Sequence, residues 1–253
     1  MAGKMNFQKR IRSCALSAAG IAFSVAFASQ VFADGEDPNA KSKSKAAPGI
    51  QTVGKDEVAK LEKLNKKYGS AKALTMNVKK TLTLGLLGDE KKSSGKLWIA
   101  NGELRMDLEG AEEKFTLVVN KKNFFAATDT SKQFKGAAVQ VVTGDTQSKK
   151  AKEQALTSLL SSSGFLKAFK PTGMNVLPTG ETVYFLQPLK NQDQFSRAQI
   201  KVSKDGQKIE EFKYWDSVDN STSMEFSDVA FGGKVDPKLF DYTPPANADV
   251  MKM

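Results

Sequence analysis

The sequence contains no histidine and a single cysteine, Cys14, among its 253 residues. The lack of histidine excludes Ser-His and Cys-His nucleophile pairs, histidine-ligated metal sites and imidazole proton shuttles. A single cysteine forms neither an intramolecular disulfide nor a thiolate metal site. We therefore expect no metal, no cofactor and no catalytic residue, and most familiar hydrolase chemistries are excluded.

Long uncharged runs are also scarce, and the main one lies near the N-terminus. Residues 14–28 are small and apolar, and they follow a basic stretch with Lys4, Lys9, Arg10 and Arg12. Small residues offer cleavage sites after Ala28 and after Ala33. The run is short for a membrane span and is followed by turn formers, so residues 1–33 are predicted to be a secretory signal peptide. An uncleaved anchor is the alternative.

Cys14 lies before the apolar run, whereas the lipidated cysteine of a bacterial lipoprotein lies after it. We therefore expect an exported chain that carries no lipid anchor. The net charge of +10 comes mostly from lysines spread over turns, a pattern typical of solvated turns. Steering toward acidic partner surfaces or anionic headgroups is the alternative interpretation.

The exported part is predicted to hold a flexible linker, residues 34–54, and one domain, residues 55–253. The linker is rich in Lys, Ser, Ala, Pro and Gly and has almost no large apolar residue. Residues 56–68 carry Val58, Leu61, Leu64 and Tyr68 at helical spacing, with Gly69 just after them. This pattern predicts an amphipathic helix.

From Leu74 the apolar residues alternate with polar ones, which is the period of a β-strand with one buried face. Lys80 alone interrupts the apolar side. Short polar turns separate the runs that follow, and this succession predicts an antiparallel meander. The predicted strands cover residues 74–86, 96–100, 103–108, 115–119, 124–127, 182–187, 197–203, 208–215 and 223–230.

Two short helices, residues 151–160 and 164–170, are predicted to interrupt the strands. A strongly bent sheet has a concave face to cover, so we interpret these helices as a lid. The lid side chains are Leu156, Leu159, Leu160, Phe165, Leu166 and Phe169. An apolar concave face under a lid would suit a large apolar guest, but alternating apolar residues equally fill a packed core. Periodicity does not separate the two.

Three stretches resemble the LolA family, which comprises periplasmic carriers that move lipoproteins to the outer membrane. They are Gly-Lys-Leu-Trp-Ile at 95–99, Glu-Leu-Arg-Met-Asp-Leu at 103–108, and the ending Val-Asp-Pro-Lys-Leu-Phe-Asp-Tyr-Thr-Pro-Pro at 235–245. The resemblance extends over residues 57–250. It implies a mainly β protein with α-helix: an open, strongly curved antiparallel sheet, or unclosed half-barrel, with a helical lid over an apolar cavity.

The resemblance also implies a function. Such a carrier accepts the acyl chains of lipoproteins from an inner-membrane ABC exporter and hands them to an outer-membrane, LolB-like acceptor. We expect it to be a monomer of one domain. We expect it in the periplasm, without nucleic acid as a partner. The acyl-chain cavity residues are then Leu74, Met76, Val78, Trp98, Leu104, Met106, Phe115 and Leu117.

The chain departs from the family at one place. Many members carry an Arg-Pro pair after the second strand, where the arginine is thought to hold the lid, and here Ala100 and Asn101 stand instead. Arg105 matches a second family arginine and is the candidate latch. Three other functions stay open: a carrier of a glycolipid or isoprenoid lipid, an enzyme using the serines at 161–163, and a nucleic-acid binder using the basic surface.

Overall fold

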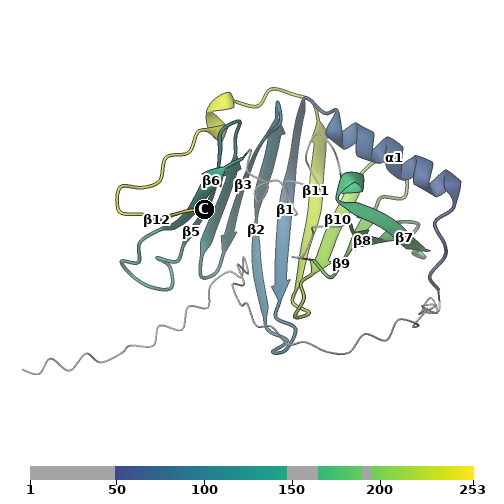
Figure 1. Ribbon diagram of the computed structural model, residues 1–253, viewed down its shortest axis with the longest axis horizontal. Helices are drawn as coiled ribbons and strands as arrows, with labels where there is room; N and C mark the ends of the chain where they lie inside the picture. Colours follow the sequence, from purple (N-terminus) through teal and green to yellow (C-terminus); the bar gives the residue numbers. More distant parts are fainter. Residues whose placement is uncertain (1–48, 147–164, 190–194) are drawn as a thin grey trace, which may run out of the picture. The chain divides into compact units, whose positions relative to one another are not determined.

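The computed structural model describes residues 49–146, 165–189 and 195–253 (Figure 1). This part of the chain is mostly β. Its helices are α1 (Lys55–Gly69) and the 3-10 helices η1 (Phe165–Lys167) and η2 (Pro237–Phe240). Its strands are β1 (Ala73–Thr83), β2 (Glu90–Ala100), β3 (Glu103–Gly110), β4 (Lys114–Val119), β5 (Asn123–Asp129), β6 (Gln140–Asp145), β7 (Phe169–Val176), β8 (Thr182–Pro188), β9 (Arg197–Val202), β10 (Ile209–Trp215), β11 (Ser221–Phe231) and β12 (Asp249–Lys252).

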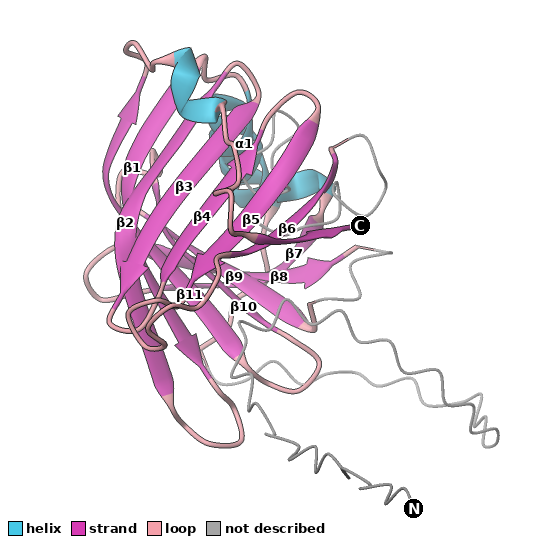
Figure 2. Cartoon of the chain, turned by 90° about the vertical axis from the view of Figure 1, so that its left-hand side faces the viewer, coloured by secondary structure: helices cyan, strands magenta, loops and turns pink. Residues whose placement is uncertain are grey.

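All twelve strands belong to one sheet with the order β12-β6-β5-β4-β3-β2-β1-β11-β10-β9-β8-β7. Neighbours pair in antiparallel fashion, except that β12 pairs with β6 in parallel. Figure 2 shows the C-terminus beside β6. The edge strands β12 and β7 do not pair with each other, so the sheet is not closed. The predicted fold class, an open antiparallel half-barrel with a helix, is confirmed.

Helix α1 covers β8 to β11 on one side of the sheet, which we call the helix face. It buries Leu61, Leu64 and Tyr68. The Tyr68 ring packs edge-on against Phe231 at 5.0 Å, and its hydroxyl accepts a hydrogen bond of 2.9 Å from the Ile209 backbone N–H. The predicted helix and most of its apolar stripe are therefore confirmed.

The opposite side of the sheet, which we call the C-terminal face, is covered over β1 to β5 by residues 235–242. Phe240 forms a buried cluster with Ala73 and Ala100. Farther along, the Asn120 side chain donates to the Phe240 carbonyl over 3.2 Å, and the rings of Phe125 and Tyr242 lie 5.3 Å apart. The two faces of the sheet are thus buried by segments from opposite ends of the domain.

The long strand predicted over residues 74–86 ends earlier, at Thr83. Residues 84–89 form a turn instead, closed by a hydrogen bond of 2.9 Å from the Leu84 N–H to the Asp89 carbonyl. Gly88 takes a φ of +69° within this turn, a conformation that glycine adopts without strain. Leu86, predicted on the buried side, is 95% exposed at the tip of this turn.

The helix predicted over residues 164–170 is wrong. Only the short 3-10 helix η1 forms, and Phe169 begins strand β7. Pro171 explains the difference, because proline disfavours helical backbone at the residue before it and lacks the N–H that a helix needs. Phe169 is therefore a buried sheet residue and not part of a helix. The helix predicted over residues 151–160 lies outside the described residues.

Three strands were not predicted: β6, β7 and β12. At the end of the predicted linker, Gln51 pairs with Met174 of β7 through backbone hydrogen bonds of 2.8 and 2.9 Å. This part of residues 34–54 is therefore attached to the edge of the sheet. The predicted signal peptide, residues 1–33, lies outside the described residues. No helix within the described ranges is long and apolar enough to cross a membrane.

The pairing is irregular in one half of the sheet. Register shifts occur between β1 and β11, between β9 and β10, and between β7 and β8. From β1 through β6 the ladders run without a shift. Because a bulge increases the local twist and bend of a strand, curvature concentrates in the half that α1 covers.

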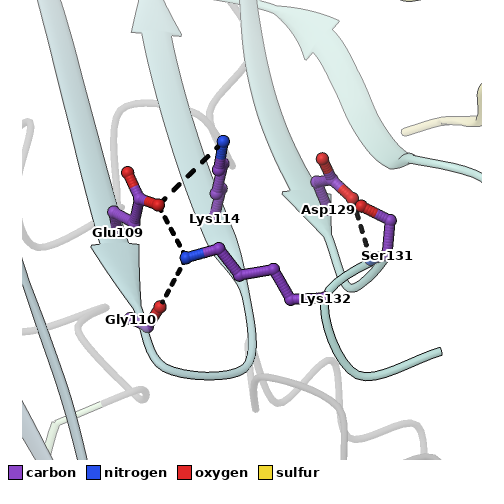
Figure 3. A network of polar contacts seen from close by, with 6 residues as sticks. All are labelled: Glu109, Gly110, Lys114, Asp129, Ser131 and Lys132. Carbon is purple, nitrogen blue, oxygen red and sulfur yellow. Dashed lines mark hydrogen bonds and ion pairs between the residues drawn. The ribbon is translucent and has the colours of Figure 1, made fainter. Parts of the chain in front are cut away.

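A polar network ties the turn after β5 to the turn after β3 (Figure 3). The Lys132 ammonium donates to Glu109 over 2.6 Å and to the Gly110 carbonyl over 3.1 Å, while Lys114 lies 4.0 Å from Glu109. The Lys132 hydrogen bond is the main cause of the lowered pKa of Glu109. These groups are exposed, so we assign the network a local role in ordering the turns.

The Tyr68 hydroxyl is expected to stabilise the packing of α1 on the sheet. Tyr68→Phe keeps the ring but leaves the buried Ile209 N–H without an acceptor, so we expect a loss of about 1–2 kcal/mol in urea unfolding. Burial raises the pKa of Tyr68 to about 12, although the Ile209 hydrogen bond lowers it. The neutral hydroxyl therefore stabilises the fold fully below the ordinary tyrosine pKa of 10.0, and this contribution is lost as the pH rises toward about 12.

Tyr242→Phe is the matched control, because no described residue hydrogen-bonds to the Tyr242 hydroxyl. We expect it to change the free energy of unfolding by less than about 0.5 kcal/mol. Equal losses in the two variants would contradict the role assigned to the Tyr68 hydroxyl. So would a stability difference between wild type and Tyr68→Phe that stays constant above pH 10.

Candidate functional site

Apolar side chains form parallel rows across the helix face from β1 to β4. One row consists of Met76, Leu97, Met106 and Leu117, each directly opposite the next. Directly opposite residues of an antiparallel pair point to the same face. Flanking rows place Leu74 beside Ile99 and Leu104, and Leu108 beside Phe115. The regular ladders thus bring distant parts of the sequence into one apolar surface.

Seven of the eight predicted cavity residues lie on this surface. Each is between 1% and 7% exposed: Leu74, Met76, Val78, Leu104, Met106, Phe115 and Leu117. The middle row continues onto β5 and β6 as Ala126 and Val142, which are only partly buried. The row is therefore fully covered at β1 to β4 and partly open toward β6.

Trp98 does not lie with the other seven. It is directly opposite Thr75 on one side and Arg105 on the other, which places it on the C-terminal face. There it packs against the cluster of Ala73, Ala100 and Phe240. The strand period predicts this position, because Trp98 differs by one residue from Leu97 of the apolar row. The prediction relied on the family resemblance instead.

Arg105 also lies on the C-terminal face. Its Nε donates to Asp107 over 2.8 Å and its Nη1 to the Leu239 carbonyl over 3.1 Å. Asp107 in turn accepts a hydrogen bond of 2.9 Å from the Thr116 hydroxyl. Arg105 therefore holds the C-terminal segment to the sheet. Most of the predicted lid lies outside the described residues, so the latch between Arg105 and the lid stays a prediction.

The predicted lid residues divide into three groups. Leu156, Leu159 and Leu160 lie outside the described residues. Phe165 is fully buried in η1, and the neighbouring Leu166 N–H donates to the Asn65 side chain of α1 over 3.2 Å. Phe169 packs in the sheet with its ring 6.0 Å from that of Phe212. The described part of the predicted lid is thus a bridge between α1 and β7.

Lys80 is the polar exception on the helix face, and its site role was not predicted. It lies directly opposite Met224 on β11 and Ser93 on β2, and Met224 continues a row through Phe212 and Ile200. Its ammonium lies 5.5 Å from the centre of the Phe115 ring. Burial lowers the pKa of Lys80, and the charge of Glu113 opposes this shift. The interruption of the strand period at Lys80 was the available signal.

Two hollows adjoin the covering segments. One of about 240 Å³ lies between α1 and strands β7 to β9, where the Tyr184 hydroxyl donates to Glu57 over 2.6 Å. The Lys60 hydrogen bond, followed by that of Tyr184, lowers the pKa of Glu57. The other, of about 570 Å³, is lined by Ala100, Asn101 and residues 233–237. Neither is lined by the eight predicted cavity residues.

Within the described ranges, no group of three or more acidic or cysteine side chains could hold a metal ion. Over the same described residues, the helix face carries a broad apolar surface that is mostly covered, and the partly buried Lys80 lies among its apolar side chains. Such a surface is suited to binding a large apolar group.

Comparison with known proteins gives one extensive sequence match. The family model described as "Outer membrane lipoprotein carrier protein LolA" matches residues 70–243. No curated protein shows a significant match.

Similar folds occur among solved structures at low sequence identity. An uncharacterized conserved protein from Thermus thermophilus is 12% identical, with a TM-score of 0.45 over 78% of this chain and 99% of that one. A LolA superfamily protein from Nitrosomonas europaea is 10% identical, with a TM-score of 0.39 over 76% of this chain and 98% of that one. Lipoprotein LppX from Mycobacterium tuberculosis is 12% identical, with a TM-score of 0.38 over 71% and 97%. The sequence match, rather than these likenesses, carries the family assignment.

Arg105 is expected to stabilise the C-terminal segment. Arg105→Met removes the donors to Asp107 and to the Leu239 carbonyl, so we expect a loss of about 1–2 kcal/mol in the free energy of unfolding. Faster proteolysis within residues 232–245 should accompany it, as measured by mass spectrometry of the fragments.

The other arginine of the described residues, Arg197, is the control. Its ion pair with Asp219 is exposed, with side-chain exposures of 57% and 71%. Arg197→Met should therefore change stability by less than about 1 kcal/mol and leave the C-terminal segment protected. If both variants expose residues 232–245 equally, Arg105 does not hold that segment.

Proposed function

Because the chain belongs to the LolA family of outer membrane lipoprotein carrier proteins, we propose that it is a carrier that shelters acyl chains on the helix face of its sheet. The observation that supports this most directly is the continuous apolar surface formed by the rows of Leu74, Met76 and Val78 with their cross-strand neighbours. The carrier binds and releases its cargo without covalent chemistry.

The dimensions of this surface suit an acyl chain. Strands lie about 4.8 Å apart, so the row from Met76 on β1 to Ala126 on β5 extends over about 20 Å. Each buried CH₂ contributes about 0.8 kcal/mol. A chain lying along the row would therefore be stabilised enough to stay out of water without any polar contact.

Cargo entry requires a movement. The seven cavity residues are almost fully covered, so a bound acyl chain has to displace what covers them. The partly open end of the row, at Ala126 and Val142, is the natural place for entry. We assign the role of movable cover to the segment carrying Leu156, Leu159 and Leu160. A weakly closed cover favours cargo exchange. The cargo can open the cover only by as much free energy as it gains from binding the open state more tightly than the closed one, so a strongly closed cover would stay shut.

In the full proposal, residues 1–33 direct export and are removed, and the mature protein works as a monomer in the periplasm. It accepts the acyl chains of lipoproteins from an inner-membrane ABC exporter and delivers them to an outer-membrane acceptor, LolB-like where one exists. A carrier of another amphiphile, such as a glycolipid or isoprenoid lipid, is the second candidate, because the apolar surface by itself does not select the polar end of the cargo.

Purification of the mature protein from a periplasmic fraction tests this function. We expect a soluble one-to-one complex whose lipid extract contains acyl chains. A peptide covalently attached to those chains identifies a lipoprotein, and its absence identifies another amphiphile. An N-terminus at Ser29 or Asp34 would establish signal cleavage. Protein that carries no acyl group, and takes none up from detergent-solubilised lipoproteins, would contradict the carrier function.

Ala126→Glu is expected to weaken binding of fluorescently labelled palmitate at least about tenfold. The substitution places a carboxylate on the partly open end of the apolar row, where a bound chain would desolvate it. Tenfold corresponds to about 1.4 kcal/mol, which is a modest fraction of the cost of desolvating a charge.

Ser94→Glu is the control, because Ser94 is exposed on the C-terminal face of β2. It should leave both palmitate binding and the thermal midpoint unchanged. Equal affinities for Ala126→Glu and Ser94→Glu, with both proteins folded by circular dichroism, would place the acyl chain elsewhere.

A further inference from the structure

Lys80 occupies a position where the pattern of the sheet calls for an apolar side chain. A row on the helix face runs from Met174 through Tyr184, Ile200, Phe212 and Met224 to β1. On β1 this row meets Lys80, and on β2 it ends in the small polar Ser93. The lysine is thus a cation at the edge of an apolar surface, three residues before β1 ends.

No described residue forms a hydrogen bond or an ion pair with the Lys80 ammonium. Glu113 acts on Lys80 through its charge but lies beyond ion-pair distance. The Phe115 ring, 5.5 Å away, supplies only a weak cation–π contact.

A partly buried ammonium without a counter-ion is unfavourable, because burial removes water molecules that would otherwise solvate its charge. The lowered pKa of Lys80 expresses this cost. An anionic oxygen at this position would offset it by forming a charge-assisted hydrogen bond. An uncharged ester or amide would do so less well, since a hydrogen bond to a charged partner is about twice as strong.

We propose that Lys80 binds the anionic headgroup, a carboxylate or a phosphate, of an amphiphile whose acyl chain lies along the apolar rows. This inference rests on the proposed carrier function and specifies the polar end of its cargo. Val78 and Met76 follow Lys80 on the same face of β1, so the chain can extend from the headgroup directly onto the row that contains Met106. Lys80 lies three residues before β1 ends at Thr83, so the headgroup would lie toward that end of the strand.

Three single-chain ligands test the proposal on the full mature protein by calorimetry below their critical micelle concentrations. Palmitate carries a carboxylate, lysophosphatidylglycerol a phosphate, and monopalmitoylglycerol no charge. We expect at least one anionic ligand to bind about tenfold or more tightly than the uncharged one. Whether palmitate or lysophosphatidylglycerol shows the preference identifies the headgroup.

Lys80→Met should abolish this preference while leaving the affinity for monopalmitoylglycerol unchanged, and Lys80→Arg should retain it. Lys79→Met is the matched control, because Lys79 is exposed on the opposite face of the same strand. A wild-type protein without preference, or a Lys80→Met variant that loses all three ligands equally, would overturn the role of Lys80 and leave the carrier function intact. If none of the three ligands binds the wild type, the carrier function itself fails.

Discussion

The structure depends on the antiparallel pairing of β1 with β11. Strands β1 to β6 form one meander and β7 to β11 another, and this single pairing joins them into one sheet. It brings together residues far apart in the chain: the Asn77 side chain donates to Asp228 over 2.6 Å across 151 positions of sequence. Without it the apolar rows would stop at β1, and α1 would cover a separate sheet. Closing so long a loop is slow, which predicts slow folding for this topology.

Much of the fold could be predicted from the sequence because one face of most strands is buried. Alternation located the first strand, short runs between polar turns located eight more, and the spacing of Leu61, Leu64 and Tyr68 located α1. The missed elements have other physical origins. Strand β7 contains Pro171 and Gly173, which weaken a strand signal, and β12 is held by parallel pairing with β6 rather than by its own exposed residues. Neither pairing is visible in local periodicity.

The site was predictable to the extent that it follows the strand period. Seven cavity residues share a face because they alternate regularly, whereas Trp98 and Arg105 were assigned by family resemblance against that period. Both serve the C-terminal segment, whose course over β1 to β5 is set by tertiary contacts such as Arg105 with Leu239. Lys80 was visible as an interruption, but the burial of its ammonium and its lack of an ion-pair partner among the described residues follow from the tertiary structure alone.

The uneven distribution of register shifts has a mechanical consequence. The half of the sheet that carries α1 is bent by three irregular pairings, whereas the ladders from β1 to β6 are unbroken. A regular ladder resists shear, because sliding one strand by a residue would reverse every side chain along it. The β1 to β6 half thus keeps a fixed spacing of side chains, and flexing of the sheet is expected to concentrate in the half that carries the irregular pairings.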